Sequence, residues 1–97
     1  MKLLVSWEIH PDKRHEVFKA FADMDLADYQ VSGGPNIKVL GRWHDLINGR
    51  GYGFYETTDK TALTAWVMQW NAAVDFEIDV VHDDEEAHSI VRSHFGE

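Results

Sequence analysis

Seven side chains that can bind or transform a small molecule occupy alternating positions in three short stretches of the sequence, residues 2–10, 37–45 and 51–57. Carboxylate, imidazole and guanidinium groups supply general acids, general bases and anion-binding groups. Two aromatic rings among them can form the floor of a pocket for a planar ligand. The predicted ligand-binding residues are Glu8, His10, Arg42, His44, Tyr52, Phe54 and Glu56.

Two interpretations of these residues remain open. In the first, Arg42 pairs with a glutamate or binds a ligand's carboxylate, and His10 or His44 acts as a general base or acid near neutral pH. In the second, the polar groups pair with one another on a hydrated sheet or a dimer interface. The spacing assigns no catalytic residue, so whether the protein is an enzyme stays open at this stage.

Metal and cofactor sites are not predicted. The stretch HDDEEAH places His82 and His88 around four acids, but this separation does not align the two rings on one helical face. The acids there fit the start of a helix, where negative charge is favourable. The chain has no cysteine, and NGRGYG lacks the lysine and the following helix of a phosphate-binding loop. We therefore expect neither metal nor cofactor.

Length and charge limit the function further. The 97 residues, 44% of them hydrophobic, fit a single domain over residues 1–97. A formal net charge of −8 makes the protein acidic, which argues against nucleic acid and against anionic membranes as partners. No apolar run approaches the length of a membrane span. The absence of cysteine and of a cleavable leader pattern leads us to expect a cytoplasmic protein.

Hydrophobic periodicity predicts the elements that carry these side chains. Alternation predicts strands over 2–10, 37–45, 51–57 and 76–82, and the Asn48-Gly49 pair predicts a hairpin turn. A helix that starts at Pro11 should end before residues 28–36, where Gly33 is one of several structure breakers. A second helix, capped by Thr58 or Asp59, and a third over residues 84–95 follow. For the third helix, we expect its apolar stripe to dock on the domain or on a second subunit.

The same alternation predicts which side of the sheet each residue faces. The strongly apolar face should lie under the helices, and it comprises Leu3, Val5, Trp7, Ile9, Ile37, Val39, Trp43, Phe76, Ile78 and Val80. Arg42 and His44 then point to the other face. The side that each residue of 51–57 faces is ambiguous. We prefer the arrangement in which Gly53 and Tyr55 lie under the helices, because the opposite one would bury Glu56. We expect Trp66 and Trp70 to be core residues.

The element order predicts an α+β fold of the ferredoxin-like βαββαβ type, with a four-stranded antiparallel sheet, two helices on one face and a short C-terminal helix. A domain of this kind with an open second face resembles the dimeric α+β barrel superfamily. Three stretches are similar to a bacterial and cyanobacterial-phage family of small domains of unknown function: GRWHDLINGRGYGFYETTDKTAL, WVMQWN and FEIDVVHDDEEAHSIVRS. The resemblance implies a homodimer around a small interior and carries over no catalytic residue.

These observations predict an uncharacterised homodimeric barrel that binds a small ligand or a partner at its open sheet face. The alternatives are a cofactor-independent oxygenase or isomerase in the barrel interior, with Arg42 stabilising an anion, and a protein whose whole role is assembly. The dimer should form through the patch of Leu4, Leu40, Tyr52, Phe54 and Val81. Its register should be set by Lys38 and Arg42 of one copy against Glu77 and Asp79 of the other.

Overall fold

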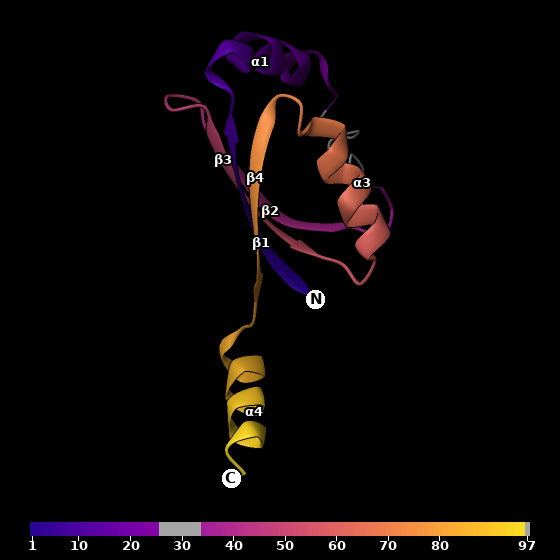
Figure 1. Ribbon diagram of the computed structural model, residues 1–97, viewed down its shortest axis with the longest axis vertical. Helices are drawn as coiled ribbons and strands as arrows, with labels where there is room; N and C mark the ends of the chain where they lie inside the picture. The colour runs from indigo at the N-terminus through magenta and orange to yellow at the C-terminus, as the bar shows by residue number, and fades with distance from the viewer. Residues whose placement is uncertain (26–33, 97) are drawn as a thin grey trace.

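The computed structural model describes residues 1–25 and 34–96, so Gly33 lies outside the described residues. The elements follow the predicted order with bounds shifted by one or two residues in most cases (Figure 1). The elements are β1 (Lys2–Ile9), η1 (Pro11–Lys13), α1 (Arg14–Asp23), β2 (Lys38–Asp45), β3 (Arg50–Glu56), α3 (Lys60–Trp70), β4 (Val74–Val81) and α4 (Asp84–His94).

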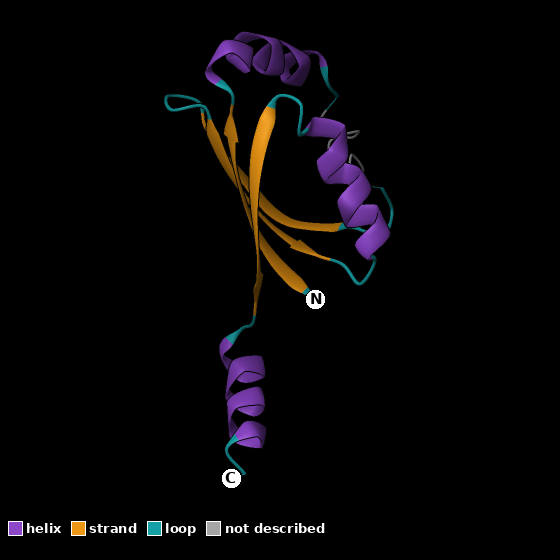
Figure 2. Cartoon of the chain, viewed as in Figure 1, coloured by secondary structure: helices purple, strands orange, loops and turns teal. Residues whose placement is uncertain are grey.

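The strands form one four-stranded antiparallel sheet in the order β2-β3-β1-β4, which confirms the predicted sheet and puts β2 and β4 at its edges. Helix α3 lies along one face of this sheet, whereas α1 crosses one end of it (Figures 1 and 2). The lower part of β4 continues past α3. Val80 on that part is 57% exposed, so its predicted place under the helices is wrong.

The core lies between α3 and the inner face of the sheet. Alternate residues of β1 point inward, and Trp66 of α3 meets them from the other side. The buried core consists of Leu3, Val5, Ile37, Tyr55 and Trp66. Helix α3 begins where the Asp59 carboxylate accepts a hydrogen bond of 2.9 Å from the Ala62 backbone N–H, which satisfies one of the free donors of its first turn.

Two glycines in β3 decide how the inner face is shaped. A Cβ placed on Gly51 would overlap the indole of Trp7, and one placed on Gly53 would overlap the ring of Tyr55. The two rings therefore lie in the space that the missing side chains leave, and Tyr55 is completely buried there. This arrangement confirms the preferred facing of residues 51–57, with Tyr52, Phe54 and Glu56 on the open face.

A bulge in β2 corrects the predicted facing of that strand. Val39 is paired with Tyr55, and Gly41 with Phe54, so Leu40 is an extra residue between them. One extra residue reverses the side on which every later side chain points. Arg42 and His44 consequently face the helices and not the open face. Trp43 lies on the open face, 64% exposed, and is not a core residue as predicted.

Helix α4 extends away from the rest of the domain (Figure 1). Its predicted apolar stripe stays uncovered within the chain: Ile90 and Val91 are exposed and Phe95 is 71% exposed. The expectation that this stripe docks on its own domain is therefore wrong, and docking on a second subunit stays a prediction.

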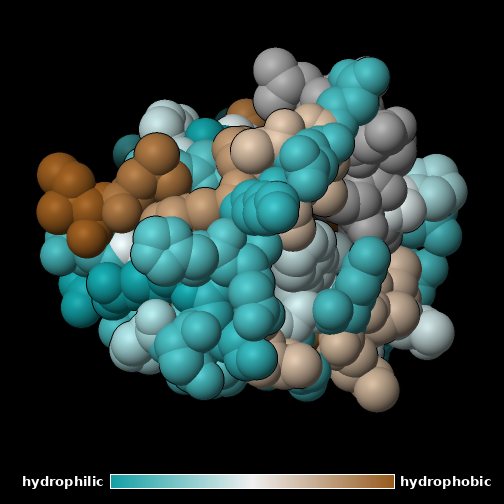
Figure 3. Space-filling view, turned by 90° about the horizontal axis from the view of Figure 1, so that it is seen from above, coloured by the Kyte–Doolittle hydropathy of each residue, from teal (hydrophilic) through white to brown (hydrophobic). Residues whose placement is uncertain are grey.

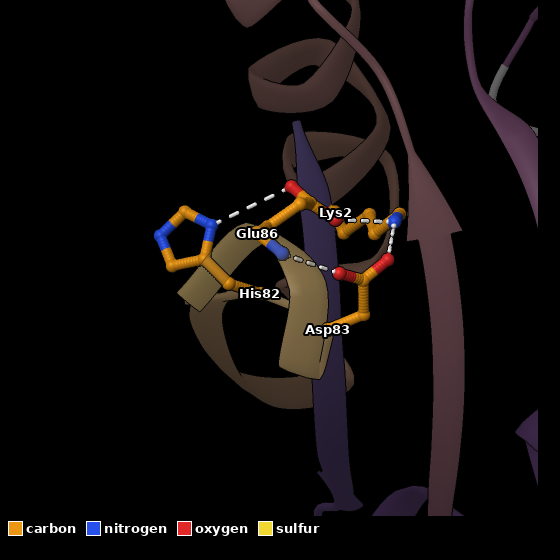
Figure 4. A network of polar contacts seen from close by, with 4 residues as sticks. All are labelled: Lys2, His82, Asp83 and Glu86. Atoms are coloured by element: carbon orange, nitrogen blue, oxygen red, sulfur yellow. Dashed lines mark hydrogen bonds and ion pairs between the residues drawn. The ribbon is translucent and has the colours of Figure 1, made fainter. Parts of the chain in front are cut away.

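The base of α4 is held to β1 by charges (Figure 4). The Lys2 ammonium donates to the Asp83 carboxylate at 2.8 Å and to Glu86, and Asp83 also accepts from the Glu86 backbone N–H. The Lys2 hydrogen bond, followed by that from the Glu86 backbone, lowers the pKa of Asp83 to about 2. Glu86 thus binds Lys2, and lies 3.7 Å from His82, instead of closing a reciprocal capping box.

We predict that Gly53→Ala lowers the free energy of unfolding by about 1–3 kcal/mol, because the added methyl group must displace the fully buried Tyr55 ring. Urea denaturation measures the difference. The matched comparison is the same substitution in a Tyr55→Leu background, where it should cost clearly less. Equal costs in the two backgrounds would show that the ring does not set the requirement for glycine.

Candidate functional site

A cavity of about 90 Å³ lies between the inner face of the sheet, α1 and α3, and it is open to solvent on one side in the described part of the chain. Its walls are mainly apolar and aromatic. Fifteen residues line it: Trp7, Ile9, Val17, Phe18, Phe21, Met24, Arg42, His44, Leu46, Arg50, Tyr55, Trp66, Trp70, Val74 and Phe76. An enclosed apolar space with a few polar groups is the usual form of a small-molecule site.

The main polar feature of this cavity joins Arg42 and Tyr55. The Nε–H of Arg42 donates to the Tyr55 hydroxyl at 2.8 Å, and the guanidinium carbon lies 5.3 Å from the centre of the tyrosine ring. Tyr55 also packs against Trp66, with ring centres 4.9 Å apart. The bond satisfies a buried hydroxyl and fixes the direction in which the guanidinium points.

His44 lies beside this pair and contacts the aromatic wall. Its ring centre is 4.8 Å from that of Phe21 and 5.8 Å from that of Trp7. Burial, followed by the positive charge of Arg42, lowers the pKa of His44 below its ordinary value. A lowered pKa favours the neutral imidazole, which is the form that can accept a proton.

The charges around the cavity are of one sign. Arg42 lines it, Arg50 borders it at the end of β3, and no acidic side chain is among the described residues that line it. The chain as a whole carries a formal charge of −8. The cavity is thus a positively charged interior in an acidic protein, which favours entry of an anion over a cation.

The predicted site residues are divided between two places. Arg42 and His44 reach the cavity, whereas Glu8, Tyr52 and Glu56 are exposed on the opposite face of the sheet. Phe54 is half-buried on that same opposite face, where it is paired with Leu4. The prediction that one site lies at the open face is therefore wrong for Arg42 and His44.

His10 belongs to neither group. It follows β1, and its Nε2 lies 2.9 Å from an Asp75 carboxylate oxygen on β4. That hydrogen bond raises the pKa of His10, although burial opposes the change. His10 does not line the cavity. Of the two histidines considered as a base, His44 alone lies where a ligand can be enclosed.

The open face carries an apolar patch over β1, β2 and β3. Trp43 is paired with Tyr52, and Leu4 with Phe54. A Cβ on Gly41 would overlap the Trp43 ring, so this indole lies flat over the strand. Leu4, Leu40 and Tyr52 are exposed as well. Leu46 and Ile47 of the β2–β3 turn are also exposed. An apolar projection is seen in brown at the left of Figure 3, the side on which this turn lies in Figure 1.

Sequence reasoning missed most of the cavity wall, and two features of the sequence indicate it. Glycine at alternate positions of a strand, as at Gly51 and Gly53, marks close approach of large groups. Glycine within an alternating run, as at Gly41, marks a possible bulge. Together they place Tyr55 and Arg42 on one face, which strict alternation does not do.

Comparison with known proteins gives a family and no activity. Within residues 1–25 and 34–96, no helix has the length and hydropathy of a membrane span, and no three His, Cys, Asp or Glu side chains gather as metal ligands would. The search of curated proteins returns no match. The family model of a domain of unknown function, DUF3303, matches residues 1–95. The chain therefore belongs to the DUF3303 family of domains of unknown function.

Proposed function

We propose that this domain binds a small molecule in the cavity between its sheet and its helices. The observation that carries the proposal is the Arg42–Tyr55 hydrogen bond inside a space walled by aromatic side chains. Apolar walls supply affinity by burying ligand surface, and a few fixed polar groups supply orientation. The site differs from the one that alternation in the sequence indicates, since it lies under the helices.

The size of the cavity limits its ligand. An apolar cavity of ~150 Å³ accommodates benzene. The space here is smaller, at about 90 Å³, but it is open on one side. A molecule with one ring can place part of that ring inside and the rest in the opening. Larger ligands must extend into solvent or against α1.

We predict that benzyl alcohol, a neutral one-ring probe, binds with a Kd of about 1 mM, about −4 kcal/mol. The indole N–H signals of Trp7, Trp66 and Trp70 should shift saturably in nitrogen-15 spectra, because all three line the cavity. Trp43 lies on the other face and should not shift, so it is an internal control.

Two valine variants complete this test. Val17→Phe should fill the cavity and weaken binding at least fivefold, whereas Val80→Phe on the exposed end of β4 should have no effect. Absence of a saturable shift in the wild-type protein would contradict the proposal. Shifts of Trp43 as large as those of the other indoles would contradict it as well.

A second candidate function, a cofactor-independent isomerase, is supported by the neutral state of His44 next to Arg42. His44 could take a proton from carbon next to a carbonyl group while Arg42 stabilises the enolate oxygen that forms. Returning the proton to oxygen gives the enol, so no cofactor or oxidant is needed. An oxygenase at the same residues would use O2 as its second substrate.

We predict for this candidate that the protein accelerates the keto–enol conversion of phenylpyruvate, followed by the ultraviolet absorbance of the enol. His44→Gln should lower the rate by about 10²–10⁴-fold, the usual contribution of a general base. His88→Gln, on the exposed α4, should keep the full rate. A rate that His44→Gln leaves unchanged would eliminate His44 as the base.

We also propose that two copies of the chain pack through their open sheet faces. Exposed apolar side chains gathered on one face are a common mark of an interface, and the charges on the flanking strands suit a two-fold arrangement. Lys38 lies on β2, whereas Glu77 and Asp79 lie on β4, so an antiparallel copy can place acid opposite base. Arg42 faces the cavity and takes no part in this pairing, unlike the role predicted for it.

We predict that the wild-type protein is a dimer at micromolar concentration and that Trp43→Glu makes it monomeric, because the interface would bury a carboxylate among apolar side chains. Light scattering measures the mass. Ile47→Glu is the matched control, since Ile47 is 90% exposed in the β2–β3 turn and away from the patch. A monomeric wild-type protein would contradict the dimer, and a dimeric Trp43→Glu variant would exclude this face.

A further inference from the structure

We propose that the ligand of the cavity is a small planar aromatic acid whose anionic group lies against Arg42 and whose ring lies among the aromatic walls. This inference rests on the proposed small-molecule binding and adds the chemical class of the ligand. Three independent features of the cavity support it: its charge, the shape of its walls and the position of its polar groups.

The charge of the cavity selects an anion. A carboxylate that enters meets the guanidinium of Arg42, with Arg50 at the border, and no acidic side chain among the described lining residues. Low polarity in the walls strengthens the attraction between ligand and guanidinium compared with water. The acids of the described residues lie outside this lining; they include Asp12 of η1, Glu16 and Asp23 of α1, and the acids of β4 and α4.

The walls select a planar ring. Tyr55, Trp66 and Phe76 form a run of tilted contacts, with ring centres 4.9 Å and 5.7 Å apart. Trp7 and Phe21 enclose the space near His44. Aromatic rings at such distances and tilts provide edges and faces for a further ring, and each aromatic contact favours binding beyond the burial of surface alone.

The polar groups lie on the strand side of the space. Arg42 and Tyr55 come from β2 and β3, so the acid group of a bound molecule should point to the sheet and its ring toward α1 and α3. Tyr55 accepts a hydrogen bond from Nε of Arg42, and this contact restricts the orientation of the guanidinium. Tyr55 is accordingly a positioning residue, and Arg42 is the residue that contacts the ligand.

Benzoate and benzamide test this inference because they have nearly the same shape and differ in charge. Each is titrated into the full-length protein at pH 7, with the indole N–H signals as the readout. We expect benzoate to bind at least tenfold more tightly than benzamide. Arg42→Gln should weaken benzoate to the level of benzamide and leave benzamide within about twofold of its wild-type Kd. Lys19→Gln, an equal loss of charge on the exposed side of α1, should keep the preference.

A second readout is the titration of His44 by NMR. A bound carboxylate opposes the effect of Arg42, so benzoate should raise the pKa of His44 and benzamide should not. Arg42→Lys keeps the charge and should retain part of the preference for benzoate over benzamide. This variant still tests the inference if Arg42→Gln fails to fold.

Each result separates this inference from the proposed function. Equal affinities for benzoate and benzamide in the wild-type protein would overturn the anionic class and leave small-molecule binding intact. Equal weakening of both probes by Arg42→Gln would also overturn it, because Arg42 would then act only on the fold. Binding of neither probe would overturn both proposals together.

Discussion

The inner face of β3 has no side chain at Gly51 and Gly53, and the arrangement of the cavity depends on that absence. The rings of Trp7 and Tyr55 occupy the two vacated positions. Both rings line the cavity, and Tyr55 also packs against Trp66 of α3. Any larger residue at either glycine would displace one of these rings and change the shape of the cavity. The cavity is therefore a consequence of the strand sequence and not of imperfect packing.

The bulge at Leu40 turns two polar side chains, Arg42 and His44, toward that space. Without it, strict alternation would turn Arg42 and His44 to the open face and Trp43 to the core. With it, the cation and the imidazole lie on the inner face of the sheet, where Arg42 is paired with Gly53 and His44 with Gly51. The same extra residue sends Trp43 outward, where it enlarges the apolar patch of the open face.

Local sequence rules predict the elements of this fold well and the site only in part. The strands, the Asn48-Gly49 turn and the Asp59 cap follow from alternation and turn chemistry, each of which acts over a few residues. The facing of β3 could also be inferred, since burying Glu56 without a partner would be costly. Gly41 indicates that a bulge can occur in β2, but alternation within this strand does not show where the extra residue lies, because that depends on the register of β2 against β3. The position of α4, which extends away from the domain, could not be predicted either, because an amphipathic pattern does not show what covers its apolar face.

Neighbouring residues of β2 point to opposite faces of the sheet, so the sheet separates the cavity from the open face. Arg42 lines the cavity, whereas its neighbour Trp43 is exposed on the open face, where we propose that a second copy of the chain packs. Because the two side chains point in opposite directions, either can change with little direct effect on the surroundings of the other. Their shared backbone still couples them: a shift in the pairing of β2 would exchange the two faces at once, burying the indole and exposing the guanidinium. The register of one edge strand thus fixes both the charge of the cavity and the apolar character of the outer face.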